Sequence, residues 1–142
     1  MADGRFRQYY WEVRTLLAEK DHLLDRSDPE FELSQEIDAE YIGAFWATIV
    51  FVNGSRLAVR FMLTDADVIE EFNYSYQYLD AQGKRVFRYD DAPHHPEVAT
   101  HPHHVHRGPE PPQYERDKAY ALDVHRVDFA TIFARIEQRC FS

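Results

Sequence analysis

The sequence has little cysteine and no long apolar run, and each shortage excludes a class of protein. Its single cysteine, Cys140, can form no internal disulfide, which fits a reducing compartment. The longest apolar run, residues 41–52, is interrupted by Gly43 and Thr48 and is too short to cross a bilayer as a helix. The N-terminus also lacks the apolar core of a signal peptide. These features predict a cytoplasmic protein that makes no membrane contact.

Basic residues are outnumbered as well. The chain has 16 Lys and Arg against 25 Asp and Glu, which gives a formal net charge of -9. A charge of this sign repels a polyanion at long range, so a general nucleic-acid-binding protein is disfavoured. The charges are unevenly spread, however, because Arg85, Arg88 and Arg107 flank a histidine-rich segment. The sequence therefore remains compatible with a local anion site.

Apolar and aromatic residues are abundant. Of the 142 residues 44% are hydrophobic, and there are ten Phe and nine Tyr. Disordered chains have few aromatic residues and much charge, so this composition predicts a folded protein. The length suits one domain with one core, which we expect to span residues 1–142.

Apolar spacing predicts a helix followed by strands. Apolar residues recur every three or four positions from Phe6 to Leu24, which indicates an amphipathic helix over residues 5–26 that ends before Pro29. Beyond that proline the period changes to two, which is typical of a strand with one wet face. A tight hairpin is expected at Asn53-Gly54. The predicted strands are residues 31–37, 41–52, 57–63, 68–79 and 85–90.

The strand over residues 68–79 is expected to turn its aromatic side chains toward the core, namely Phe72, Tyr74, Tyr76 and Tyr78. Glu70 shares this face, where an unpaired carboxylate is costly. Two explanations stay open: a β-bulge turns Glu70 outward, or Glu70 faces the histidine-rich segment. We favour the bulge.

After Asp90 the regular pattern stops for about thirty residues. Six prolines between Pro93 and Pro112 remove backbone donors and disfavour helix, so a long irregular loop is predicted. Residues 120–127 could add one strand, and Asp128 caps a closing helix that buries Phe129, Ile132, Phe133 and Ile136. The predicted fold is α+β: an antiparallel five- or six-stranded β-meander with N-terminal and C-terminal helices packed on one face.

Six of the eight histidines lie between His94 and His106. Three motifs mark this region: Tyr76-Gln77-Tyr78, Arg88-Tyr89-Asp90-Asp91-Ala92-Pro93-His94-His95-Pro96-Glu97 and Pro102-His103-His104-Val105-His106. In order and spacing these motifs resemble the TumE-type toxins of bacterial toxin–antitoxin systems. The resemblance implies a small cytoplasmic toxin that restrains growth and is paired with a cognate antitoxin protein.

Two places depart from the pattern of that family. The family usually has Asn where this chain has Asp91, which adds a negative charge beside the histidines. It usually reads Phe-Pro-His-His-Lys-His where this chain has His101 in place of the Phe and Val105 in place of the Lys. The comparison implies that His101 is not a site residue and that any phosphate-binding role of that Lys is absent.

Two histidines held apart can act as base and acid in one reaction, because imidazole titrates near neutrality. In RNA cleavage one imidazole takes the proton of the 2′-hydroxyl, the other protonates the departing 5′-oxygen, and Arg88 can neutralise charge on the phosphorane. Asp90 or Asp91 would orient one imidazole. The sequence thus predicts a metal-independent ribonuclease without a cofactor, with a site made of Arg88, Asp90, His94, His95, His103, His104 and His106.

Three alternatives stay open. In the first alternative, His94 and His95 stabilise a turn and have no role in catalysis. In an extended segment His104 and His106 point to one side, so a Zn²⁺ or Ni²⁺ site there needs a third ligand from His94 or His95. The segment could also be a rigid partner-binding surface without catalysis. Besides the antitoxin, the partners considered are RNA and a second copy of the chain in a homodimer.

Overall fold

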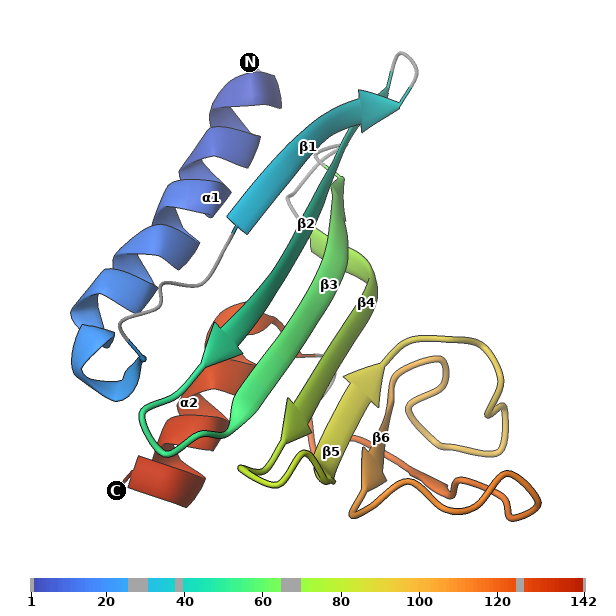
Figure 1. The fold of residues 1–142 in the computed structure, drawn as a ribbon. Helices are drawn as coiled ribbons and strands as arrows, with labels where there is room; N and C mark the ends of the chain where they lie inside the picture. Colours follow the sequence, from blue (N-terminus) through green and yellow to red (C-terminus); the bar gives the residue numbers. More distant parts are fainter. Residues whose placement is uncertain (1, 26–30, 38–39, 65–69, 125–126, 142) are drawn as a thin grey trace.

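The described part of the chain folds into one antiparallel sheet, two α-helices and a short 3-10 helix. The computed structural model describes residues 2–25, 31–37, 40–64, 70–124 and 127–141. In chain order the elements are α1 (Ala2–Glu19), a 3-10 helix (Asp21–Leu23), β1 (Phe31–Ile37), β2 (Glu40–Val50), β3 (Arg56–Thr64), β4 (Glu70–Leu79), β5 (Arg85–Asp90), β6 (His104–Arg107), β7 (Ala119–Tyr120) and α2 (Phe129–Phe141). The strands pair in chain order, as Figure 1 shows for β1 to β6, and β7 has only two residues. The predicted α+β meander is confirmed.

Most element boundaries agree with the sequence pattern. Strand β5 spans Arg85–Asp90 as predicted, whereas α1 already ends at Glu19. The β2–β3 hairpin turns at Asn53 and Gly54. Gly54 has a φ of +85°, and a Cβ placed there would lie 3.2 Å from the Cβ of Ala81. Both the backbone conformation and the space therefore favour glycine.

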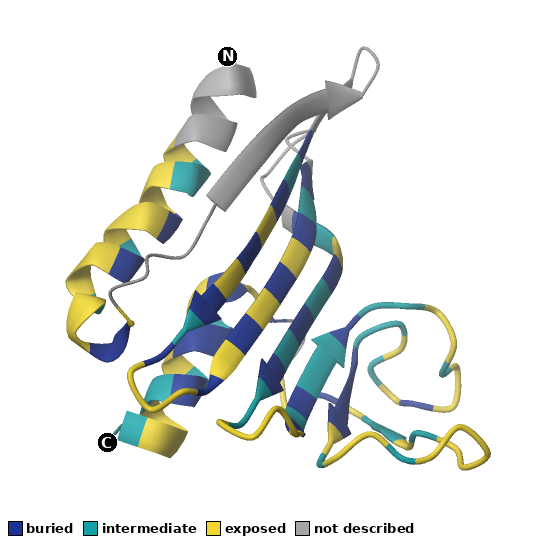
Figure 2. Cartoon of the chain, viewed as in Figure 1, coloured by how far each residue is buried: buried dark blue, intermediate teal, exposed yellow. Residues whose placement is uncertain are grey.

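The sheet has a helix-covered face and an open face. Helix α2 lies against the covered face with α1 beside it (Figure 1), and buried and exposed residues alternate along the strands (Figure 2). Phe129 of α2 meets Phe45 of β2 with ring centroids 6.3 Å apart. Asp128 accepts a hydrogen bond from the Thr131 N–H at 2.9 Å, which confirms the predicted helix cap. The four predicted core residues of α2 are buried: Phe129, Ile132, Phe133 and Ile136.

A β-bulge interrupts β4. The register with β3 shifts between Arg60 and Met62, and Asn73 has a φ of +51°. The bulge that we favoured in this strand is therefore confirmed. On its C-terminal side the tyrosines face the core as predicted, with exposed fractions of 2% or less: Tyr74, Tyr76 and Tyr78.

On the N-terminal side of the bulge the predicted pattern is wrong. The extra residue reverses the alternation, so Phe72 lies opposite Met62 and is only half-buried. Glu71 instead lies opposite the buried Leu63 and is itself buried. The side chain of Glu70, on which the prediction centred, lies outside the described residues.

The histidine-rich segment also contains a strand. We predicted an irregular loop, but β6 pairs with β5 so that Asp90 lies opposite His104 and Arg88 opposite His106. The prediction failed because no proline lies within β6, and pairing with β5 is a long-range contact that local pattern does not reveal. The remainder of the described segment has turns and no helix, as predicted. The last predicted strand, residues 120–127, is reduced to β7, with residues 125 and 126 outside the described part.

Candidate functional site

Strands β5 and β6 bring four predicted site residues to one place on the open face. Side chains alternate along a strand, so Arg88 and Asp90 share a face, and so do His104 and His106. The register sets the two pairs against each other. The ring centroids of His104 and His106 are 4.9 Å apart.

His95 completes the group from the loop between β5 and β6. Its ring centroid lies 4.8 Å from that of His104 and 5.2 Å from that of His106. One ring nitrogen from each of the three residues lies within 4.8 Å of the others. We call His95, His104 and His106 the histidine cluster.

A chain of turns folds His95 back over β6. The Val98 N–H donates to the His95 carbonyl at 3.2 Å, and the His101 N–H donates to the Val98 carbonyl at 3.0 Å. The Thr100 hydroxyl donates to the His103 carbonyl at 2.6 Å and accepts from the Leu122 N–H at 2.9 Å. Val98 is buried, with an exposed fraction of 7%. The loop is therefore anchored at several points.

Each ring of the histidine cluster is oriented through its Nδ1 atom. Nδ1 of His104 lies 2.9 Å from the Pro102 carbonyl, and Nδ1 of His106 lies 3.1 Å from the Lys118 carbonyl. Nδ1 of His95 lies 3.2 Å from Oε1 of Glu97. A carbonyl or ionised carboxylate only accepts, so each Nδ1 carries a hydrogen. Nε2 therefore remains for chemistry in His95 and His106, whereas Nε2 of His104 lies 3.0 Å from Asp90.

Asp90 is the carboxylate that supports the cluster. It is 4% exposed and lies 3.0 Å from Nε2 of His104 through Oδ1. Its Oδ2 accepts from Nε of Arg88 at 3.1 Å and lies 3.9 Å from Nε2 of His106. The Ala92 N–H donates to Oδ1 at 3.0 Å. The orienting role that the sequence left open between Asp90 and Asp91 therefore fits Asp90.

The pKa values of Asp90 and His104 move apart. Burial alone would raise the pKa of Asp90, but the hydrogen bonds from His104 and the Ala92 N–H outweigh it, so the pKa is lowered. Burial alone would lower the pKa of His104, but hydrogen bonds to Asp90 and to the Pro102 carbonyl outweigh it, so this pKa is raised. The raised pKa favours the protonated form of His104, which can donate from both ring nitrogens, to Asp90 and to the Pro102 carbonyl.

His106 has the opposite character. Burial lowers its pKa, and the attraction of Asp117 offsets this only in part. Its Nε2, at 3.9 Å from Asp90, is beyond hydrogen-bond distance and keeps its lone pair. His95 has the most accessible ring, since its side chain is 16% exposed against 2% for His104 and 8% for His106. The cluster therefore combines a ring whose pKa is lowered, His106, with a ring whose pKa is raised, His104, and the more accessible ring of His95.

Two predicted site residues lie apart from the cluster. His94 is exposed in the turn that follows β5. His103 packs on Tyr74, on the helix-covered side, with ring centroids 5.8 Å apart and its Nδ1 2.9 Å from the tyrosine hydroxyl. Asp91 accepts the backbone N–H groups of Asn73 and Tyr74, both at 2.9 Å, and so holds the β4 bulge.

The three arginines that flank the histidine-rich segment lie in three different environments. Arg85 is buried and makes a bidentate ion pair with Asp117 at 2.7 and 2.8 Å. Arg107 lies over the ring of Tyr120 at 4.7 Å from its centroid. Arg88 is the arginine that lies beside the cluster.

The site predicted from the sequence omitted two carboxylates that lie beside the Nδ1 atoms of His95 and His106. Glu97 holds His95, and Asp117 lies 3.5 Å from Nδ1 of His106. Asp117 belongs to no motif and lies in the proline-rich segment, where no local pattern distinguishes it. Only the path of the chain brings it to the cluster.

The cluster also has the geometry of a metal site. Within the described part of the chain it is the group of side chains that could hold a metal ion. Three imidazoles with their other N–H held by carbonyl or carboxylate oxygens are the arrangement that metal-binding histidines adopt. His95 lies where a third ligand beside His104 and His106 would be needed.

Comparisons with other proteins place this site in a family. Among the described residues no helix is both long and apolar enough to span a bilayer. No curated protein and no solved structure is significantly similar to the chain. A family model described as Toxin TumE matches residues 16–140, a range that includes Arg88, Asp90 and the whole histidine cluster. The chain therefore belongs to the TumE toxin family.

Proposed function

We propose that this chain is the toxin component of a toxin–antitoxin pair and that it cleaves RNA at the histidine cluster without a metal ion. Family membership supports the toxin class and implies a cognate antitoxin partner. One observation carries the proposed chemistry: His106, whose pKa is lowered by burial, lies beside the accessible His95, with ring centroids 5.2 Å apart and within reach of a single phosphate.

Each group has a defined part in the proposed reaction. Nε2 of His106 takes the proton of the 2′-hydroxyl, and the 2′-oxygen attacks phosphorus. The bond from phosphorus to the 5′-oxygen breaks, and protonated His95 gives its Nε2 proton to the leaving oxygen. The products are a 2′,3′-cyclic phosphate and a 5′-hydroxyl. The positive charges of His104 and Arg88 stabilise the phosphorane, while Asp90 keeps His104 protonated and oriented.

Single substitutions in adjacent histidines test this proposal. His95→Ala and His106→Ala should each lower RNA cleavage by about 10²-fold or more and abolish growth arrest on expression in bacteria. His94→Ala is the matched control, since this neighbouring ring is exposed and outside the cluster. Equal loss in all three variants would contradict the assigned roles. Growth arrest by a protein that leaves RNA intact would exclude the ribonuclease.

A metal-binding function is the second candidate, favoured by the three rings whose Nδ1 atoms are all held. It predicts about one equivalent of Zn²⁺ or Ni²⁺ retained through dialysis and a lower melting temperature in chelator. His106→Ala should abolish both effects, and exposed His22 is the control position. Metal-free protein with full toxicity would exclude this candidate.

A further inference from the structure

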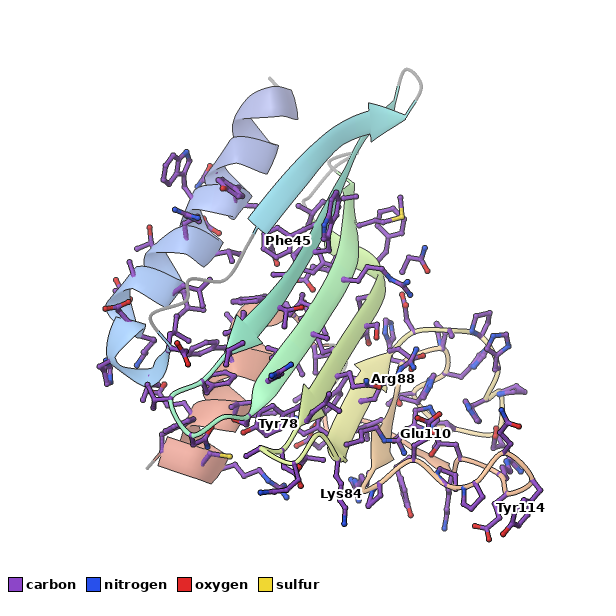
Figure 3. The ribbon with its side chains drawn as sticks, viewed as in Figure 1. Phe45, Tyr78, Lys84, Arg88, Glu110 and Tyr114 are labelled. Atoms are coloured by element: carbon purple, nitrogen blue, oxygen red, sulfur yellow. The ribbon has the colours of Figure 1, made fainter. Side chains whose placement is uncertain are left out.

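A groove lies on the open face next to the proposed active site. It has a volume of about 250 Å³ and is lined by Ala58, Val59, Arg60, Ser75, Gln77 and Arg88. Arg88 belongs both to this groove and to the surroundings of Asp90. Figure 3 shows Arg88 between the strands of the groove and the loops that carry Glu110 and Tyr114. The groove is therefore continuous with the site.

Strand register extends this surface across the sheet. Two rows of directly opposed residues run from β2 toward β6 on the open face, and we call them the open-face rows. The first row is Trp46, Arg60, Ser75, Asp90 and His104, and the second is Thr48, Ala58, Gln77, Arg88 and His106. At roughly 4.8 Å per strand, each row spans about 19 Å.

The charge of the groove is opposite to that of the protein. Arg60 is exposed, and no carboxylate among the described residues pairs with it. Arg88 uses Nε to bind Asp90, and its side chain is 39% exposed, so its terminal nitrogens can reach a ligand. The small side chains of Ala58 and Ser75 leave room between the two guanidinium groups. This is a local anion site in a chain of net charge -9.

An aromatic side chain stands at the far end of the first row. Trp46 is 41% exposed on β2 and lies directly opposite Arg60. Exposed aromatic rings beside cations on a sheet are the means by which proteins hold single-stranded nucleic acid: bases stack on the rings and phosphates meet the cations.

We propose that the open-face rows bind a single-stranded segment of the RNA substrate, which runs from the cleaved phosphate at the histidine cluster toward Trp46. This inference rests on the proposed ribonuclease function. RNA is the occupant that fits because the rows, from β2 to β6, combine two arginines with an exposed tryptophan, and their one carboxylate, Asp90, is buried and lies 3.0 Å from Nε2 of His104. The local charge also explains how an acidic protein would hold a polyanion.

Binding to an RNA that cannot be cleaved tests the inference apart from the chemistry. The probe is a fluorescein-labelled 2′-O-methyl oligouridine of about twelve nucleotides, and the readout is fluorescence anisotropy over a range of salt concentrations. Trp46→Ala should weaken binding about 5-fold or more. Arg60→Gln should weaken it and lower the slope of log affinity against log salt by about 0.7.

The chain supplies matched controls. Trp11 is 61% exposed on α1, and Arg139 is exposed on α2, so Trp11→Ala and Arg139→Gln make the same chemical changes away from the groove. Both controls should bind the probe as the wild type does. Since the chain has two tryptophans, Trp11→Phe leaves Trp46 as the sole one, and the probe should quench its fluorescence.

The outcomes separate the two proposals. If Trp46→Ala and Arg60→Gln bind the probe as tightly as the wild type, the RNA track is wrong, even where RNA is cleaved at the histidine cluster. If these variants lose only neutralisation by the antitoxin, the face binds protein and the inference is overturned. If binding depends on Trp46 and Arg60 but RNA is never cleaved, the track stands and the ribonuclease proposal falls.

Discussion

Two buried carboxylates on adjacent strands of the sheet, Glu71 and Asp90, behave in opposite ways. Their exposed fractions are 3% and 4%, so water reaches neither. Glu71 lies on the helix-covered face, where its hydrogen-bond donors include the hydroxyls of Tyr9 and Tyr76 and the Phe129 N–H. Asp90 lies toward the open face and pairs with His104, an imidazole whose pKa is raised by this contact.

The difference shows that the charge of the hydrogen-bond partner decides the direction in which the pKa of a buried carboxylate moves. Burial raises the pKa of Glu71 to about 7, because neutral donors compensate for the lost water only in part. For Asp90 the hydrogen bonds from His104 and the Ala92 N–H, with the attraction of His104 and Arg88, outweigh the effect of burial and lower the pKa. Glu71 joins α1, β4 and α2 and serves the core, whereas Asp90 organises the site.

The largest effect is expected for Asp90→Asn, which removes the charge but keeps the shape. It leaves His104 buried without its counter-charge, which should lower the free energy of unfolding by about 3–5 kcal/mol. The Asp90–His104 pair stabilises the fold above the ordinary pKa of Asp90, and this stabilisation is lost as pH falls through the lowered pKa of Asp90 in the folded protein. On the alkaline side the pair stabilises the fold below the ordinary pKa of His104, and this stabilisation is lost as pH rises through the raised pKa of His104. Urea unfolding should show the largest gap between about pH 4 and 6.5, and a gap independent of pH would contradict the pairing.

Glu71→Gln should give the next largest effect and the opposite trend. A carboxyl with a raised pKa adds full stability below its ordinary pKa, and that stability falls as pH rises toward about 7. Wild-type protein should therefore lose up to about 3 kcal/mol between pH 4.5 and 7 through this group. The Gln variant should lack that loss in urea unfolding at the two pH values. Exposed Glu110 is the control position, where Gln should leave the pH dependence unchanged.

Asp117 offers a partly exposed carboxylate for comparison, with a side chain 33% exposed. The pKa of His106 is lowered by burial and partly restored by Asp117, so the acidic limb of the cleavage profile should lie below about pH 6.5. Asp117→Asn should move that limb to lower pH, because the attraction that partly restores the pKa of His106 is removed, and the effect is limited because solvent screens this pair. The check is the pH dependence of kcat/KM. An unchanged limb would show that Asp117 acts only through Arg85.

The smallest effect is expected for Asp91→Asn, one residue from the largest. Asp91 receives two backbone N–H groups of the bulge, and Asn has one acceptor oxygen, so about 1 kcal/mol should be lost. Toxicity should persist, because Asp91 contacts no ring of the cluster among the described bonds. Growth arrest and urea unfolding should be measured for Asp90→Asn and Asp91→Asn side by side, which compares the two neighbouring carboxylates directly. Loss of toxicity at normal stability would place Asp91 in the site.

Much of the fold could be predicted because it depends on local pattern. Alternating apolar residues define β5, the Asn53-Gly54 pair supplies a turn with positive φ, and Asp128 supplies a helix cap. These features rest on residues within a few positions of one another, which is the range over which periodicity is informative. The motifs around the histidines likewise indicate the toxin family, which the family model confirms.

Which histidines act together could not be predicted in the same way. His94 and His95 are adjacent in one motif, yet only His95 meets β6, because the turns after it carry the chain back across the strand. Asp90 and Asp91 diverge because neighbouring side chains leave the backbone on opposite sides. At Glu71 one extra residue in the bulge exchanges the two faces of the strand.

The sequence by itself therefore determined the kinds of elements, their order and the segment that carries the chemistry. The tertiary structure decided which side chains of that segment meet, which of them are charged and which surface continues from them. The physical reason is range: periodicity and turn chemistry act between near neighbours, whereas register, burial and pKa depend on contacts between residues far apart in the chain, such as Arg85 with Asp117 or Glu71 with Phe129.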